Sequence, residues 1–275
     1  MSYANVMVHV QPGRSNAALL EVAGELASRF KADVIGIAAC QPMQAFYGEG
    51  YVNPESIDID RNLIAAQLHE AEAEFRAALK TQAGALDWRT SVSPLPIAQI
   101  VAREARSADV VITSSGISGL SNHTRRADTS DLVMQVGRPV LIVPHNARSM
   151  KLQRVVVFWK DSRETRRAIA DALPLLMKAP YVAVVMLVPE DETLAGRMQL
   201  DAVVAWLKRH GIECWSVVVK AERDDVTQLK TIAEEQEADV IVAGAYGHSR
   251  FHEWALGGVT RDLLLHSDRC ALLSH

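Results

Sequence analysis

The sequence is poor in cysteine, with only Cys40, Cys214 and Cys270 among 275 residues. These three stand far apart and their number is odd, which argues against a disulfide framework. Each lies in or beside a strand-like apolar run, where a reduced cysteine behaves as a small hydrophobic side chain. We therefore expect three buried thiols and a cytoplasmic protein.

Long hydrophobic segments and basic clusters are also missing. No run approaches the ~18 uninterrupted apolar residues that a membrane span needs. The apolar run from Val6 to Val10 is too short for a signal peptide and lacks a basic flank. The formal net charge is −4 and no Lys/Arg-rich block is present, so nucleic-acid binding through phosphate neutralisation is unsupported. We expect neither a membrane nor a nucleic acid as partner.

What the sequence does contain is an internal duplication. The segment ADVVITSSG (108–116) is matched by ADVIVAGAYG (238–247), and NVMVHV (5–10) is matched by RVVVFW (154–159). A chain of this length suits two domains of roughly 140 residues each. We predict one domain at 1–147 and a second at 152–275, separated by the polar stretch 145–151.

Within each half, strand-like and helix-like segments alternate. The expected strands are 4–10, 33–40, 86–92, 109–114 and 139–144, then 154–160, 181–188, 213–219, 239–244 and 270–274. The expected helices of the second half are 163–178, 192–210, 224–237 and 258–267. The strands are nearly continuous runs of Val, Ile and Ala, which suit parallel strands covered on both faces. This pattern predicts an α/β fold of two tandem Rossmann-like α/β/α domains, each with a five-stranded, mostly parallel sheet.

Several local details accompany this prediction. Asp161 and Ser162 are candidate N-caps for the first helix of the second half. Its expected buried stripe consists of Ala168, Leu173, Leu176 and Met177. In the first half, the insertion Gln41–Ile57 precedes a helix expected at 58–83, and we expect this insertion to form a surface loop. Asp109 and Asp239 each precede a strand and are interpreted as helix-to-strand turn residues.

A glycine-bearing loop follows the fourth strand of the second half, at the carboxyl edge where parallel sheets bind ligands. Gly244 and Gly247 are followed, after nine residues, by Gly257, Gly258, Val259 and Thr260. Glycines let backbone N–H groups approach a phosphate, and a helix starting at about Gly258 adds its positive end. Thr260 would add a hydroxyl or cap the helix, and His248 would face the phosphates or solvent. The alternative is that these glycines are only turn residues.

In these residues the sequence resembles the universal stress protein family. Its ATP-binding members carry G-x2-G-x9-G followed by Ser or Thr, after a strand preceded by Ala-Asp. Here Ala238-Asp239, Gly244, Gly247 and Gly257 match, whereas Gly258 stands where Ser or Thr is usual. The segment FWKDSRETRRAIADALPLL (158–176) also resembles tandem members. The resemblance covers essentially the whole chain and implies the adenine-nucleotide alpha hydrolase-like form of the fold.

The resemblance implies an adenine nucleotide as ligand, ATP first, with or without magnesium, and no structural metal. In ATP-binding members an Asp at the end of the first strand contacts the nucleotide. Lys160 occupies that place here, followed by Asp161, and Leu187 would border the adenine. Lys160 reverses the charge at this position, and it would either reach a phosphate or pair with Asp161. Losing the hydroxyl at Gly258 removes a contact worth about 1 kcal/mol.

The first half departs further from the pattern. Its matching loop begins with Thr113–Gly116, Arg126 and Ala127 stand where Gly257 and Gly258 would be, and Gln11 replaces the strand-end Asp. We expect this half to bind no nucleotide and to act as a packing partner. In the family the last strands pair across a dimer, so strands 139–143 and 270–273 would form an intramolecular pseudo-dimer. A further homodimer would use other faces.

Three functions remain open from the sequence. The leading hypothesis is a stress-response protein with one nucleotide site in the second half and at most slow ATP hydrolysis. The second is a nucleotide-free interaction scaffold that uses the paired last strands. The third is an enzyme acting on an adenylated or phosphorylated substrate, but the loops Gln11–Ser15 and Lys160–Arg163 lack the SGGxDS pattern of such enzymes. A metal site at His248, His252 and Glu253 is disfavoured because these residues lie inside the glycine loop.

Overall fold

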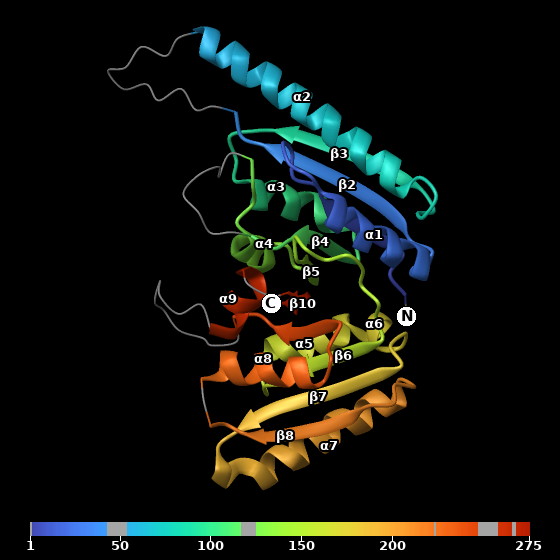
Figure 1. Cartoon of the computed structure of the whole chain (residues 1–275), viewed down its shortest axis with the longest axis vertical. Helices are drawn as coiled ribbons and strands as arrows, with labels where there is room; N and C mark the ends of the chain where they lie inside the picture. Colours follow the sequence, from blue (N-terminus) through green and yellow to red (C-terminus); the bar gives the residue numbers. More distant parts are fainter. Residues whose placement is uncertain (1, 43–53, 117–124, 223, 247–257, 266–267) are drawn as a thin grey trace, which may run out of the picture. The chain divides into compact units, whose positions relative to one another are not determined.

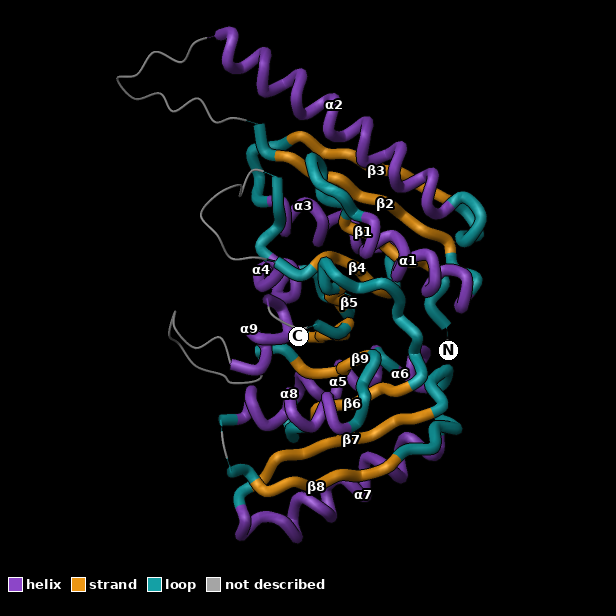
Figure 2. The backbone as a smooth tube through the Cα atoms, in the orientation of Figure 1, coloured by secondary structure: helices purple, strands orange, loops and turns teal. Residues whose placement is uncertain are grey.

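Strands and helices alternate in both halves of the computed structural model (Figure 1). The structure describes residues 2–42, 54–116, 125–222, 224–246, 258–265 and 268–275. They divide into an N-terminal unit, Tyr3–Arg138, and a C-terminal unit, Pro139–His275. In each unit helices flank a layer of strands, as Figure 2 shows by colour. The predicted α/β fold with mostly parallel strands is confirmed, although the two units contain four and six strands and not five each.

The N-terminal unit contains four parallel strands in the order β3-β2-β1-β4. Its elements are β1 (Asn5–His9), α1 (Ala17–Phe30), β2 (Asp33–Cys40), α2 (Pro54–Leu79), β3 (Leu86–Val92), α3 (Ile97–Glu104), β4 (Val110–Ser114) and α4 (Thr129–Gln135). Helix α1 contacts α2, and α3 contacts α4. These pairs follow from right-handed crossovers. The helices that connect β1, β2 and β3 lie on one face of the sheet, because these strands follow one another in one direction. The chain then returns from β3 to β4, which places the connecting helix α3 on the other face.

The C-terminal unit contains six strands in the order β5-β10-β9-β6-β7-β8. Its elements are β5 (Val140–Val143), β6 (Arg154–Phe158), α5 (Arg163–Asp171), α6 (Leu173–Leu176), β7 (Tyr181–Val188), α7 (Thr193–Arg209), β8 (Trp215–Lys220), α8 (Asp225–Glu235), β9 (Val240–Gly244), α9 (Gly258–Leu265) and β10 (Cys270–Ser274). All neighbouring pairs are parallel except β5, which is antiparallel to β10 with Leu141 opposite Leu272.

The core lies in the central strands, which are buried and mostly apolar because both of their faces are covered. Every residue of β10 is buried, and β9 is buried up to Gly244. The edge strand β8 is instead half-exposed along its length. The three cysteines are free and buried, as expected. Within the described residues, no helix is long and apolar enough to cross a membrane.

Three local predictions were wrong. The helix expected at 58–83 is α2, which begins at Pro54 inside the predicted insertion, because proline is well suited to a first helical turn. The helix expected at 163–178 divides into α5 and α6 beside Pro174, which lacks the N–H that a continuous helix needs. Met177 follows α6 and is exposed, so it does not belong to the buried stripe.

Two aspartates hold the starts of the first strands. Asp109 Oδ2 accepts hydrogen bonds from the backbone N–H groups of Ala4 and Asn5, at 2.7 and 2.9 Å. Asp239 Oδ2 accepts the same pair of bonds from Gln153 and Arg154, also at 2.7 and 2.9 Å. The sequence interpretation as turn residues missed this role, in which each carboxylate joins its own strand to the neighbouring one.

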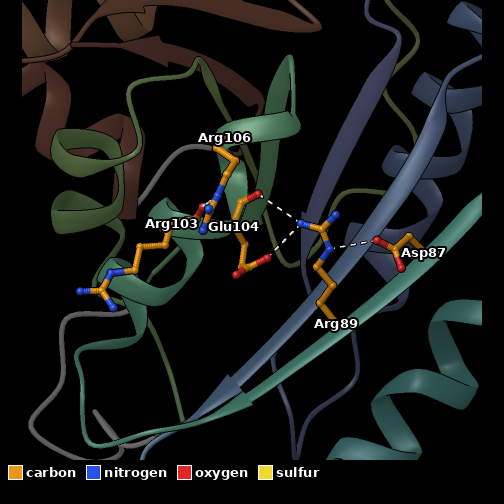
Figure 3. A network of polar contacts seen from close by, with 5 residues as sticks. All are labelled: Asp87, Arg89, Arg103, Glu104 and Arg106. Carbon is orange, nitrogen blue, oxygen red and sulfur yellow. Dashed lines mark hydrogen bonds and ion pairs between the residues drawn. The ribbon is translucent and has the colours of Figure 1, made fainter.

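An ion-pair network fastens the edge strand β3 to the end of α3 (Figure 3). Arg89 donates to Asp87 on the same strand at 2.9 Å and to Glu104 Oε2 at 2.9 Å. Its guanidinium also reaches the Glu104 carbonyl, so a cation lies at the negative end of α3. This arrangement is structural, since none of its residues follows a strand at the carboxyl edge.

The compact units divide between Arg138 and Pro139 because β5 pairs with β10. The sequence places the boundary of the duplication later, between residues 147 and 152. Strand β5 therefore belongs to the first repeat by sequence but packs with the last strand of the second. The repeat boundary stays a prediction.

Candidate functional site

The strands β6, β9 and β10 of the C-terminal unit end side by side. Phe158 lies opposite Ala243, and Gly244 lies opposite Ser274. The residues that follow these strands therefore share one carboxyl edge, the usual ligand edge of a parallel sheet. This edge is the candidate site.

Gly244 brings the exit of β9 against the first turn of α5. A Cβ placed on Gly244 would lie 2.5 Å from the Thr165 backbone nitrogen and 2.7 Å from the Glu164 carbonyl carbon. No side chain fits at these distances, so packing alone requires glycine here. As a result, the β9 exit and the start of α5 are in direct contact.

Tyr246 gives the β9 exit an uncommon backbone conformation. Its φ is 62°, in the left-handed region that non-glycine residues rarely adopt. The residue before it is fixed on both sides: Ala245 N–H donates to the Ser274 carbonyl at 2.8 Å, and the Ala245 carbonyl lies 3.2 Å from His275 Nδ1. A left-handed residue is one of the two conformations that together form an anion nest, so Tyr246 is compatible with such a turn after β9.

The start of α5 forms the second wall of the edge. Ser162 is its N-cap and accepts a hydrogen bond from Thr165 N–H at 3.2 Å, as predicted for one of the two candidates. Asp161 instead accepts two bonds from Arg166, at 3.2 and 3.0 Å. Burial raises the pKa of Glu164, but bonds from its own backbone, Ser162 and Arg163 outweigh this and leave the pKa lowered. Glu164 is therefore a carboxylate held in place, not a proton carrier near neutral pH.

Two residues at the end of β6 complete this part of the site. Lys160 is exposed at the position that the sequence assigns to nucleotide contact. Trp159 precedes it, and its backbone N–H donates to the Val185 carbonyl at 2.7 Å. Its indole Nε1 is buried and has no hydrogen-bond partner among the residues that the structure describes. A buried donor without a partner is uncommon in a folded protein and suggests a polar group that a ligand would supply.

Leu187 lies near the end of β7 and is half-exposed, whereas the next residue, Val188, is buried. A Cβ on Gly196 of α7 would lie 2.9 Å from Val188 Cγ1, so α7 packs closely on this strand end. Leu187 therefore offers an apolar surface beside β6.

The beginning of α9 reaches the same region. Val259 and Phe158 line one groove, together with residues of α8, so α9 starts close to the end of β6. Thr260 is only 6% exposed, which keeps its hydroxyl off the open surface. Both predicted roles of Thr260, a phosphate contact and a helix cap, stay predictions.

The predicted site residues thus fall into two groups. Lys160, Leu187, Gly244, Gly258, Val259 and Thr260 are described and come from strand ends and a helix start of one unit. Gly247, His248 and Gly257 lie outside the described residues, as do His252 and Glu253. Within the ranges that the structure describes, no cluster of three His, Cys, Asp or Glu residues could hold a metal. Sequence reasoning missed Trp159 and Tyr246, although an aromatic residue at a strand end was visible in both cases.

Comparisons with known proteins agree with this fold. The model of the universal stress protein family matches residues 152–273. A universal stress protein from Archaeoglobus fulgidus DSM 4304 is similar in structure, with a TM-score of 0.75 and 13% identity over 98% of this chain and 97% of that one. A putative universal stress protein from Pseudomonas aeruginosa UCBPP-PA14 has a TM-score of 0.62 and 14% identity over 99% and 93%. At these identities the likeness concerns the fold alone. No curated protein matches the sequence significantly.

Proposed function

Because the model of the universal stress protein family matches residues 152–273, we propose that the chain is a stress-response protein with one adenine-nucleotide site. The site is the carboxyl edge of the C-terminal unit, and ATP is the first candidate ligand. The observation that carries the proposal is the contact of Gly244 with the first turn of α5, which joins the β9 exit to a helix N-terminus. The positive helix end and the turned amides of the exit favour phosphate oxygens.

Each residue of the site has a distinct proposed role. Leu187 provides the apolar border of the adenine, and Trp159 Nε1 donates to the ligand. Lys160 neutralises phosphate charge, because it is a cation exposed just after β6 at the carboxyl edge. The N–H groups of Gly258 and Val259, with Gly247, His248 and Gly257 from the glycine loop, complete the phosphate contacts.

Catalysis at this edge is proposed to be absent or slow. Hydrolysis needs a base or a metal-held water close to the terminal phosphate. The carboxylates Asp161 and Glu164 are engaged by Arg166 and Arg163. Magnesium, if it accompanies ATP, would be held chiefly by the phosphates and water, as is usual for this ion.

Lys160 offers the sharpest test of the site. We expect Lys160→Glu to weaken ATP binding about 10-fold or more, because an attraction becomes a repulsion within a few ångströms of the phosphates. Adenosine, which lacks phosphates, should lose little affinity. The control is Lys178→Glu, the same charge change at an exposed position before β7, at the opposite end of the strands. Equal ATP affinity for both variants, measured by calorimetry, would remove Lys160 from the site.

The nucleotide-free scaffold is the second candidate, and one observation favours it. The apolar strands β5 and β10 pair antiparallel, with Val140, Leu141 and Ile142 opposite Leu273, Leu272 and Ala271. We propose that this pairing is the internal form of the family's dimer contact, which leaves the chain a pseudo-dimer in a cytoplasmic setting that keeps its thiols reduced. Native mass spectrometry of the purified protein separates the candidates: a retained adenine nucleotide supports the first, and an apo protein that ignores added ATP supports the second.

A further inference from the structure

The long helix α2 carries polar residues at intervals of seven: Asp60, Gln67 and Glu74. This spacing places them on one face of the helix. All three are half-buried, although they are polar or charged. The core contacts of α2 come from a separate set of buried residues: Ile64, Ala71, Phe75 and Leu79. The polar face therefore has a role other than filling the core.

Asp60 binds Arg125, the residue immediately before the Arg126 that the sequence matched with Gly257. Arg125 Nη2 donates to Asp60 Oδ1 at 2.6 Å, Nη1 donates to the Gln41 carbonyl at 2.7 Å, and Nε donates to Gln67 Oε1 at 3.3 Å. The two charged side chains are only 11% and 13% exposed. Because Gln41 directly follows β2, the guanidinium lies at the carboxyl edge of the N-terminal unit.

Gln67 and Glu74 cover the loop between β1 and α1. A Cβ on Gly13, whose φ is +76°, would lie 2.6 Å from Gln67 Nε2. Glu74 accepts hydrogen bonds from the backbone N–H of Asn16 at 2.9 Å and from its side-chain amide at 3.1 Å. Asn16 is the N-cap of α1. An internal carboxylate thus occupies the place where a helix start would otherwise attract an anion.

We propose that α2 seals the carboxyl edge of the N-terminal unit, so that this edge holds a built-in ion pair and a built-in carboxylate in place of a ligand. Asp60 and Arg125 form the central contact of the seal, and an anionic ligand enters only when they separate. The inference goes beyond the nucleotide site of the C-terminal unit and does not depend on it. Removing one partner leaves the other charge buried, which favours local opening of α2.

Cys40 is a natural reporter of this seal. It is the last residue of β2, it is fully buried, and it precedes Gln41. Burial raises the pKa of its thiol, and the carbonyl of the next residue, Gln41, accepts the hydrogen bond from Arg125. The buried thiols Cys214 and Cys270 belong to the C-terminal unit and serve as internal references.

The test measures the labelling rate of each cysteine by a thiol reagent under native conditions, resolved by peptide mass spectrometry. In Arg125→Met we expect Cys40 to react about 10-fold faster or more, and in Asp60→Asn several-fold faster, through increased local opening. The labelling of Cys214 and Cys270 should not change. The control is Asp58→Asn, two positions away on α2, where Asp58 is 71% exposed and pairs only loosely with Arg61 at 3.8 Å. Cys40 labelling in both seal variants equal to that of Asp58→Asn would overturn the proposal.

Hydrogen exchange separates a seal from general unfolding. We expect the amides of α2 to exchange faster in Arg125→Met, while those of β1 and β4 stay protected and α7 is unaffected. Loss of protection in β1 and β4 together with α2 would contradict the seal, because the pair would then be a general stabiliser of the unit.

Discussion

At the scale of single residues, the aspartates of the two Ala-Asp motifs form equivalent hydrogen bonds, so the duplication seen in the sequence is repeated in the structure. Asp109 and Asp239 make the same pair of bonds with the same distances in their two units. From the sequence alone, an Asp directly before a strand indicates only a turn. The bonds reach a different strand, more than 80 positions earlier in the chain, which no local pattern reveals.

Asp239 is therefore expected to contribute to the stability of the C-terminal unit. Asp239→Ala leaves two backbone N–H groups without their carboxylate and should cost about 2 kcal/mol, the usual scale for bonds to a charged group. Asp201→Ala, at an exposed position of α7, is the control and should leave stability unchanged. Chemical denaturation of both variants measures the difference; equal midpoints would show that the carboxylate is dispensable.

His9 makes the stability of the N-terminal unit depend on pH. It is fully buried, with Nδ1 3.0 Å from Thr113 Oγ1, and burial lowers its pKa from 6.5 to about 4. Below pH 6.5 the unfolded chain takes up a proton that the folded chain refuses, so stability is complete above 6.5 and falls until the pH reaches about 4. The loss should total about 3 kcal/mol.

The variant His9→Asn isolates this effect, because asparagine keeps a polar atom near the Nδ1 position and does not titrate. Denaturation of wild type and variant between pH 7 and pH 4 should give stability differences that shrink or reverse as the pH falls. A constant difference across that window would mean that His9 titrates alike in both states.

At the scale of elements, most strands and helices were predictable from the sequence because their apolar runs are long and uninterrupted. The strand expected at 181–188 is β7 with the same bounds, and that at 270–274 is β10. The misses have local causes: Pro174 divides a helix, and Pro54 starts one inside a segment that looked like a loop. The location of the candidate site could be predicted from the sequence, because ligands bind at the carboxyl edges of parallel strands. Its details were not predictable, since the proposed roles of Trp159 and Tyr246 rest on a buried indole N–H and on a left-handed backbone conformation, which only the folded structure shows.

Gly244 illustrates this difference. The sequence pattern indicates that Gly244 is a glycine of the phosphate-binding loop. The structure shows that the close contact of β9 with α5 also requires a glycine at this position. Gly244→Ala should cost about 2 to 3 kcal/mol, because the methyl group meets backbone atoms that cannot move aside. Gly211→Ala is the control. The φ of Gly211 is +75°, but a Cβ added there would have no atom of the described residues within 4 Å, so we expect only backbone strain of about 1 kcal/mol. Equal losses in thermal denaturation would show that the close approach is relaxed at little cost.

At the scale of the whole molecule, the chain combines one half with a candidate nucleotide edge and one half whose carboxyl edge is proposed to be occupied by its own side chains. The C-terminal half contains the residues that match the universal stress protein family model and the glycine loop. In the N-terminal half, Arg126 and Ala127 stand where Gly257 and Gly258 would be, and α2 supplies acceptors that bind Arg125 and the start of α1. The sequence predicted the loss of the glycines there, but it gave no sign that α2 would occupy the edge, because residues seven apart on a long helix look like an ordinary solvated face.

The number of adenine nucleotides bound per chain tests the central claim most directly. Calorimetric titration of the full-length protein with ATP should give one site per chain. Two equivalent sites would contradict both the closed N-terminal edge and the assignment of binding to the C-terminal unit alone, and no binding at all would leave the chain a nucleotide-free scaffold.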